Sequence, residues 1–130
     1  QLHGSEDEQF IHALMAELSN NECDFCQVWQ ASPVTNSVPL LNNEVNQHLL
    51  DGQSPGSGQP FDWQVLALSE QNLSKSFLAG GLNCNNIKQA IEQLTHIDLF
   101  GLDLNSGVEQ SPGIKSSEKL SAVFSHIRNY

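Results

Sequence analysis

The sequence predicts an α/β fold in which about four short parallel strands and a preceding strand stub alternate with helices on the outside of the sheet. Apolar runs of strand length are separated by stretches in which apolar residues recur at helical spacing. Strands that alternate with helices form a parallel sheet. Two of the apolar runs also end in Gly-containing turns, at Gly80-Gly81 and Ser106-Gly107, as expected where strands pass into polar connections.

The N-terminal part predicts a stub, a helix and a strand. Residues 2–4 are expected to end a strand, and Ser5 to cap a helix with acidic residues in its first turn. The buried stripe of this helix is expected at Phe10, Ile11, Leu14 and Leu18. Residues 25–31 are the next predicted strand, with Val28 and Trp29 at its centre.

The middle of the chain predicts a weak helix, a strand and a loop. Residues 38–45 are weakly helical, with Pro39 suited to the start. Residues 48–51 form a short strand that ends in an acid, and the Gly- and Pro-rich residues 52–60 indicate an active-site loop. Asp62 can cap a short helix whose apolar positions are Trp63, Val65, Leu66 and Leu68.

The C-terminal part predicts two more strand–helix pairs. Residues 77–79 form a strand that leads into a helix near Asn83, with its apolar stripe at Ile87, Ala90, Ile91 and Leu94. Residues 100–104 form the last strand, and Ser116 or Ser117 caps a final helix. The core face of that helix is expected at Leu120, Val123, Phe124 and Ile127.

The two Gly-containing turns predict a cradle for an anion. Unpaired N–H groups at helix starts and the helix dipole both favour a phosphate. In an eight-stranded β/α barrel, phosphates are commonly held after the last two strands, whereas the whole barrel needs about 200 residues or more. The chain has 130 residues and begins at Gln1. We therefore expect the C-terminal half of a (β/α)8 barrel domain over residues 1–130, with its N-terminal strands missing.

Composition excludes several classes of protein. The net charge is −10, and residues 1–74 contain no Lys or Arg, so a nucleic-acid-binding face is not expected. No apolar run is long enough to span a membrane. Three sparse cysteines fit a cytoplasmic protein better than a disulfide scaffold, and the Cys23–Cys26 pair alone cannot complete a zinc site. We expect no metal and no cofactor.

Working residues are expected at the carboxyl ends of the parallel strands. Asp51 follows a strand directly, and under a Gly-rich loop it could have a raised pKa and act as a general acid. The alternative is that it only caps the loop. The substrate- or phosphate-binding candidates are His3, Gly80, Gly81, Asp103, Asn105, Ser106 and Gly107. Asp103 could equally be a buried hydrogen-bonding post, and His3 could be structural.

Other polar and aromatic residues are expected to be structural. The remaining histidines lie on helices or at strand starts, where packing is the usual role: His12, His48, His96 and His126. Trp29 and Trp63 are expected in the core or in helix packing.

Five segments together resemble phosphoribosylanthranilate isomerases. They are residues 1–4, residues 49–51, residues 56–58 with 61–63, residues 78–83, and residues 103–109 with 112–115. The resemblance covers the whole chain and corresponds to the last five strands of the barrel. The Asn105-Ser106 pair and residues 127–130 are most similar to the isomerase half of the bifunctional enzyme fused behind indole-3-glycerol-phosphate synthase.

The resemblance implies the Amadori rearrangement of N-(5′-phosphoribosyl)anthranilate in tryptophan biosynthesis. The family's general acid falls on Asp51. Its general base is a cysteine that ends the first strand, and none of the three cysteines here matches it. Gln30 stands where the family often has a lysine, and Cys84 where it usually has a proline.

The resemblance also sets the expected partners. They are a small phosphorylated substrate and either the missing N-terminal half of the barrel or further copies of this chain. By itself the chain should be inactive and should expose Leu49 and either Val28 or Trp29 on its barrel-facing side. Two other functions remain open: another phosphate-binding β/α-barrel isomerase or synthase, or a non-catalytic acidic binding module.

Overall fold

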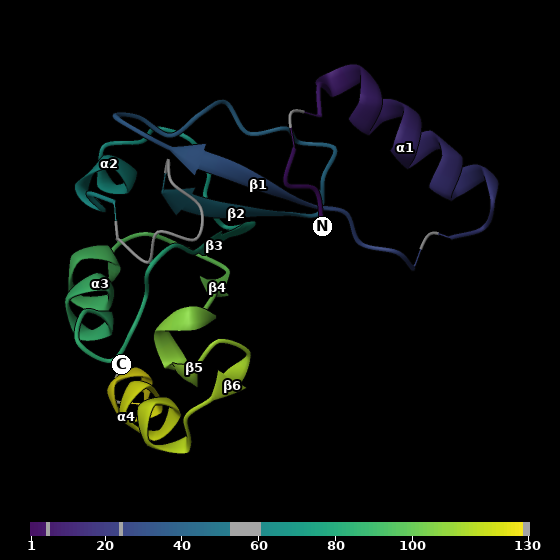
Figure 1. Cartoon of the computed structure of the whole chain (residues 1–130). Coiled ribbons are helices and arrows are strands. Elements are labelled where there is room, and N and C mark those ends of the chain that lie inside the picture. Colours follow the sequence, from purple (N-terminus) through teal and green to yellow (C-terminus); the bar gives the residue numbers. More distant parts are fainter. Residues whose placement is uncertain (5, 24, 53–60, 129–130) are drawn as a thin grey trace.

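A computed structural model describes residues 1–4, 6–23, 25–52 and 61–128 (Figure 1). Its centre is a parallel sheet in the order β1-β2-β3-β4, formed by Trp29–Val34, Gln47–Gly52, Ser76–Leu78 and Gly101–Leu102. All three pairings are parallel. Leu2 adds a parallel bridge to Gln30, which confirms the predicted stub. The predicted four parallel strands and stub are therefore confirmed among the described residues.

The helices pack mainly against one face of this sheet. Helices α2 (Gln64–Ala67), α3 (Ile87–Leu94) and α4 (Ser117–Ile127) lie on the same side of the molecule in Figure 1. The main core joins them to alternate strand residues such as Val34, Leu50 and Leu78. Alternate residues share a face because side chains point to opposite sides of a strand.

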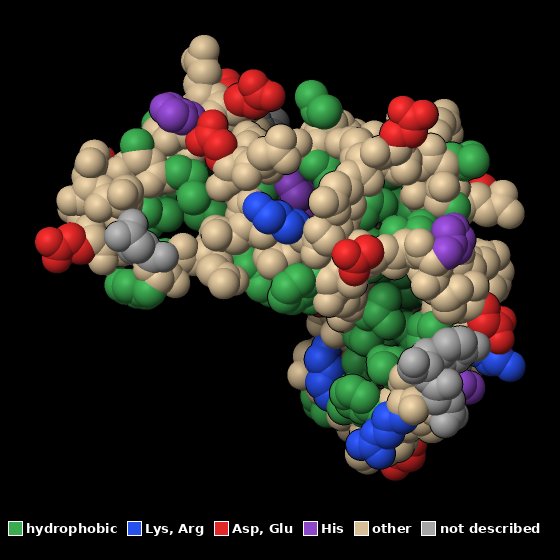
Figure 2. Space-filling model, turned by 180° about the vertical axis from the view of Figure 1, so that it is seen from behind, with side chains coloured by type: hydrophobic (Ala, Val, Ile, Leu, Met, Phe, Trp, Pro, Cys, Tyr) green, Lys and Arg blue, Asp and Glu red, His purple; other side chains and the backbone are tan. Residues whose placement is uncertain are grey.

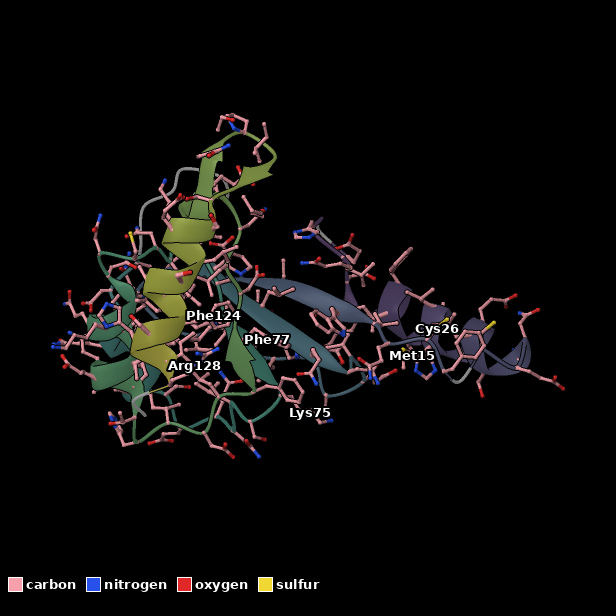
Figure 3. All side chains as sticks on the ribbon, turned by 90° about the horizontal axis from the view of Figure 1, so that it is seen from below. Met15, Cys26, Lys75, Phe77, Phe124 and Arg128 are labelled. Carbon is pink, nitrogen blue, oxygen red and sulfur yellow. The ribbon has the colours of Figure 1, made fainter. Side chains whose placement is uncertain are left out.

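Helix α1 (Glu8–Asn20) packs separately at one end of the sheet. Ile11 of α1 forms a second, small cluster with Val28 and Val45, and Leu2 and Met15 pack against it. We call α1 the α1 arm; Figure 3 shows its residue Met15 well away from Phe77 in the sheet. The bend between this arm and the lobe of α3 and α4 is visible in Figure 2, where most of the Lys and Arg side chains on that face lie over the lobe.

The opposite face of the sheet carries an aromatic stack. Trp29 stacks on Phe77 at 4.9 Å between ring centroids, and Phe77 meets Phe100 at 5.0 Å. Gly101 gives the Phe77 ring its space, since a Cβ there would lie 2.9 Å from the ring. Trp29 is half-buried in this stack and, among the described residues, belongs to neither the core nor a helix contact, so the packing expected for it is wrong. Leu49 is buried and not exposed as expected, whereas of Val28 and Trp29 it is Trp29 that keeps some exposure and Val28 that is buried. Val28 is buried in the cluster that it forms with Ile11 of α1.

Several element predictions need correction. Residues 38–45 contain no helix. Because of Pro39 and the adjacent turns, the carbonyl oxygens of Val38 and Pro39 accept hydrogen bonds from the Gln71 side-chain amide instead. The strand predicted at 25–31 begins later, at Trp29, and Phe25 before it is exposed. The observed strand also includes Pro33, which has no backbone N–H to donate. Pro33 lies beyond the bridge between Leu2 and Gln30, so no described strand on that edge requires this hydrogen bond.

The helix ends follow the predicted chemistry only in part. Asp7 caps α1 by accepting from Phe10 N, whereas the predicted cap Ser5 and residues 53–60, where a loop was predicted, lie outside the described residues. Ser116 caps α4 as predicted. Phe10 and Phe124 are half exposed, so neither belongs to a buried stripe.

The connection after β4 contains elements that the pattern did not predict. A 3₁₀ turn, η1 (Ser106–Val108), leads into an antiparallel hairpin of β5 (Glu109–Ser111) and β6 (Ile114–Lys115), and only then into α4. The strands are too short to show a periodicity. Pro112-Gly113, with Gly113 at φ +80°, was their one sequence signal.

Candidate active-site pocket

One pocket of about 480 Å³ gathers all eight predicted site residues. It lies where β2, β3 and β4 end, as the parallel topology predicts. Its lining is Gln1, His3, Asp51, Gly80, Gly81, Leu82, Asp103, Leu104, Asn105, Ser106, Gly107 and Lys115. A pocket of this size with a few convergent polar groups is typical of a small-molecule site.

The turn after β3 depends on two glycines and two asparagines. Gly80 and Gly81 have φ values of +83° and +65°, which glycine adopts at little cost. The side-chain amides of Asn83 and Asn86 both donate to the Gly81 carbonyl at 2.9 Å, and Asn86 Oδ1 accepts from Asn83 N at 2.8 Å. These bonds fix the turn ahead of α3.

Asp51 lies against this turn. Its Oδ1 accepts from the Gly52 N–H at 2.7 Å. A Cβ on Gly80 would collide with the same oxygen, so only glycine at position 80 leaves space for the carboxylate in this position. The second carboxylate oxygen has no recorded hydrogen bond within the described part of the chain.

Asp103 brings a second carboxylate to the pocket. Loss of hydration raises its pKa above the ordinary value, and the charge of Asp51 raises it further. The charges of Lys115 and His3 act in the opposite direction. The Asp103 side chain is exposed and has no recorded hydrogen bond in the described ranges. It therefore does not form the buried post that was the alternative.

The second turn packs directly against the first. A Cβ on Gly107 would collide with the carbonyl oxygen of Leu82, so Gly107 permits a close approach of the two backbones. Lys115 holds the start of this turn by donating to Asn105 O at 2.8 Å and to Asn105 Oδ1 at 2.7 Å. The two turns thus form one continuous wall of the pocket.

Sequence reasoning missed three residues that build this wall. Asn83 and Asn86 could have been found from their spacing around a helix start, where amide side chains often bond to the backbone. Lys115 was noted only as part of a motif, because the hairpin that returns it to Asn105 was not predicted.

Two of the residues interpreted as structural, His48 and Trp63, are buried in the structure. His48 is buried, its Nε2 donates to Asn42 O at 3.0 Å, and Ser32 Oγ lies 3.0 Å from its Nδ1. Burial lowers the His48 pKa. Trp63 is in the core.

The described residues show neither a metal centre nor a membrane segment. They contain no cluster of three or more potential metal ligands among His, Cys, Asp and Glu. In the same residues, no helix combines the length and the hydrophobicity of a transmembrane span.

Comparison with known proteins gives a consistent answer. Residues 1–126 match the family model described as N-(5′-phosphoribosyl)anthranilate (PRA) isomerase. The chain is 41% identical over 131 residues to "Tryptophan biosynthesis protein TrpCF" of Salmonella typhi, with all of this chain and 27% of that protein covered. It thus spans about a quarter of that relative's length.

Solved structures agree in fold. The phosphoribosyl anthranilate isomerase of Thermus thermophilus aligns with a TM-score of 0.71 at 31% identity, over 99% of this chain and 60% of that one. An isomerase in complex with reduced 1-(o-carboxyphenylamino)-1-deoxyribulose 5-phosphate aligns with a TM-score of 0.61 at 25% identity, over 100% and 59%. With a parallel sheet, a pocket at the strand ends and a family match over residues 1–126, this chain belongs to the N-(5′-phosphoribosyl)anthranilate isomerase family.

Proposed function

We propose that this chain supplies the general acid and the phosphate-binding turns of an N-(5′-phosphoribosyl)anthranilate isomerase that acts in tryptophan biosynthesis. One observation carries the proposal: Asp51, Asp103 and the two glycine turns line a single pocket. Family membership adds the reaction, because no feature of the pocket alone identifies the anthranilate group.

The phosphate of the substrate is assigned to the wall formed by Gly80-Gly81 and Asn105-Ser106-Gly107. Backbone N–H groups in such turns form anion-binding concavities. The backbone must do most of this work because the chain carries a net charge of −10. The relative crystallised with a reduced deoxyribulose 5-phosphate compound supports a sugar-phosphate ligand.

The proposed chemistry starts at Asp51. Its carboxylic acid gives a proton to the furanose ring oxygen, which opens the ring and leaves a protonated imine at C1′. A base then removes the C2′ proton to give the enolamine, which tautomerises to the ketone. Loss of hydration and the charge of Asp51 raise the Asp103 pKa, so Asp103 keeps its proton to a higher pH than an ordinary carboxyl group. The resemblance places the base on a cysteine that these residues do not provide.

We further propose that residues 1–130 form the C-terminal part of one β/α-barrel domain in the cytoplasm. The chain spans 60% of the Thermus thermophilus structure, and β4 has no partner on its outer edge among the described residues. The remaining strands and the base would come from polypeptide that corresponds to the other part of the barrel, or from further copies of this chain.

Substitution of Asp51 tests the proposal in the complete barrel. Asp51→Asn should lower kcat by about 10²–10⁴-fold, since a general acid–base group typically contributes that much, and should leave KM almost unchanged. Gly81→Val should raise KM instead, because the added side chain strains a turn at φ +65°. A near-native kcat in Asp51→Asn would show that Asp51 is not the general acid and only caps the loop.

A titration separates the competing functions. The complete enzyme should bind reduced 1-(o-carboxyphenylamino)-1-deoxyribulose 5-phosphate more tightly than inorganic phosphate. Equal affinity for the two would favour a different phosphate-binding barrel, and no affinity for either would favour a non-catalytic acidic module.

A further inference from the structure

Lys115 lines the pocket but has no donor left for a ligand. Its Nζ donates to Asn105 O at 2.8 Å, to Asn105 Oδ1 at 2.7 Å and to Glu109 Oε1 at 2.9 Å. An ammonium group has three N–H donors, so all of them are used. Lys115 therefore acts through Asn105, although it is the only Lys or Arg among the described residues that line the pocket.

Glu109 holds Lys115 in this position. The two residues face each other across the β5–β6 hairpin, and the second Glu109 oxygen accepts from Gly113 N at 3.1 Å. The hydrogen bond from Lys115 lowers the Glu109 pKa, so the carboxylate stays charged. The Glu109 side chain is only 15% exposed, against 42% for Lys115, which limits the freedom of the pair more than at an open surface.

The hairpin is in turn fastened to α4. Lys119 Nζ donates to Glu109 O at 2.6 Å, and Ser116 N donates to Val108 O at 2.8 Å. Val108, which ends η1, is buried in the main core. The turn is thus held at its start by Lys115 and at its end by the core.

We propose that Lys115 is a positioning residue that, together with Glu109, sets the Asn105-Ser106-Gly107 turn in the geometry that binds the substrate phosphate. Successive backbone N–H groups in a tight turn form a concavity that binds anions. With both Asn105 oxygens held by Lys115, the start of this turn presents donors instead of acceptors to the pocket. This inference rests on the proposed function, because it concerns how that phosphate is held.

A substitution of Glu109 distinguishes a Lys115 that positions the turn from a Lys115 that binds the phosphate through its own charge. If Lys115 bound phosphate itself, Glu109→Gln would free an N–H and strengthen binding, whereas a positioning pair predicts weaker binding. In the complete enzyme, Lys115→Met and Glu109→Gln should each raise KM by about 10-fold, which corresponds to about 1.4 kcal/mol. The inhibition constant of inorganic phosphate should rise by the same factor, with kcat within about 2-fold.

Three more variants complete the experiment. The double variant Glu109→Gln/Lys115→Met should lose no more than Lys115→Met alone, because both act on one turn, and Lys115→Arg should recover part of the loss. Lys75→Met is the charge control, since Lys75 lies far from the hairpin at the start of β3 (Figure 3). Unchanged KM in Lys115→Met, or tighter phosphate binding in Glu109→Gln, would overturn the proposal.

Hydrogen exchange tests the inference without substrate. Amide exchange at Val108, whose N–H donates to Asn105 O at 3.3 Å, should accelerate in Lys115→Met and Glu109→Gln, but not in Lys75→Met. If the wild-type enzyme shows no turnover, the proposed function fails and the exchange result still decides whether Lys115 fixes the turn. If the wild type turns over and exchange is unchanged in both variants, only the role of Lys115 fails.

Discussion

At the scale of single residues, the pocket depends on places where a side chain is absent. Gly80 leaves space for the Asp51 carboxylate, and Gly107 lets its turn meet Leu82. At both positions a Cβ atom would collide with a neighbouring oxygen, and no charge or hydrogen-bond pattern in the sequence reveals such a steric restriction.

Gly80→Ala should therefore damage catalysis as well as stability. A non-glycine residue at a positive φ costs roughly 1–3 kcal/mol of unfolding free energy, and the new Cβ also collides with Asp51 Oδ1. We expect kcat to fall at least about 10-fold as the acid is displaced. Gly113→Ala is the matched control for stability in urea unfolding, because φ is +80° there and no atom lies within 4 Å of the new Cβ. Equal losses in the two variants would contradict the collision.

Asp103 should make stability fall as pH rises. Its pKa is raised in the folded chain, so its contribution is complete below the unfolded pKa of about 3.9 and is lost as pH rises through the higher folded pKa. Asp103→Asn should match the wild type in acid and be more stable at neutral pH. Urea unfolding between about pH 3 and 7 measures this, and a wild-type advantage that grew with pH would contradict it.

At the scale of elements, α3 connects the core to the pocket. Ile87, Ala90 and Leu94 are buried in the main core, and the residues just before α3 hold the Gly81 carbonyl. The position of the first turn is thus set by hydrophobic packing one helical turn away.

Asn86→Ala should loosen that turn. It removes the donor to Gly81 O and the acceptor for Asn83 N, which should cost about 1–3 kcal/mol of unfolding free energy. We expect a several-fold rise in KM in the complete enzyme. Asn85→Ala is the neighbouring control, since Asn85 is exposed and, among the described residues, its side chain accepts one long contact from the Cys84 thiol. Parallel effects in both variants would mean that the asparagines act only through helix propensity.

The elements that the sequence predicted well are those with a strong period or a clear cap. The α3 stripe, the strand before Asp51 and the Ser116 cap belong to this group. The segment at 38–45 was decided by a distant contact with the Gln71 side chain, which a local pattern does not encode. The β5–β6 hairpin pairs residues close in sequence, but its strands are too short to show a period, and for this reason Lys115 was missed while the strand-end residues were found.

At the scale of the whole molecule, the sheet is open. β4 pairs only with β3 among the described residues, and an apolar groove of about 360 Å³ follows it, lined by Ala90, Ile91, Leu94, Thr95, Ile97, Leu99, Gly101 and Leu102. Open edges and exposed apolar surface favour association.

We expect residues 1–130 to fold, to self-associate and to show no isomerase turnover. The buried core supports folding, while the expected base is missing. Size-exclusion chromatography with light scattering tests association, and an assay with and without the remaining part of the barrel tests activity. A monomer with turnover would refute the half-barrel proposal, and an inactive monomer would refute only association.

The two hydrophobic clusters also have a consequence for cooperativity. Ile11, Val28 and Val45 form a cluster of their own, whereas the pocket turns are anchored in the larger core. Separate clusters can open with different free energies. Helix α1 is therefore the natural candidate for a sub-global unfolding unit, one that opens while the two glycine turns keep their shape. For evolution or design, this makes the α1 arm a place where sequence can be exchanged at little risk to the chemistry.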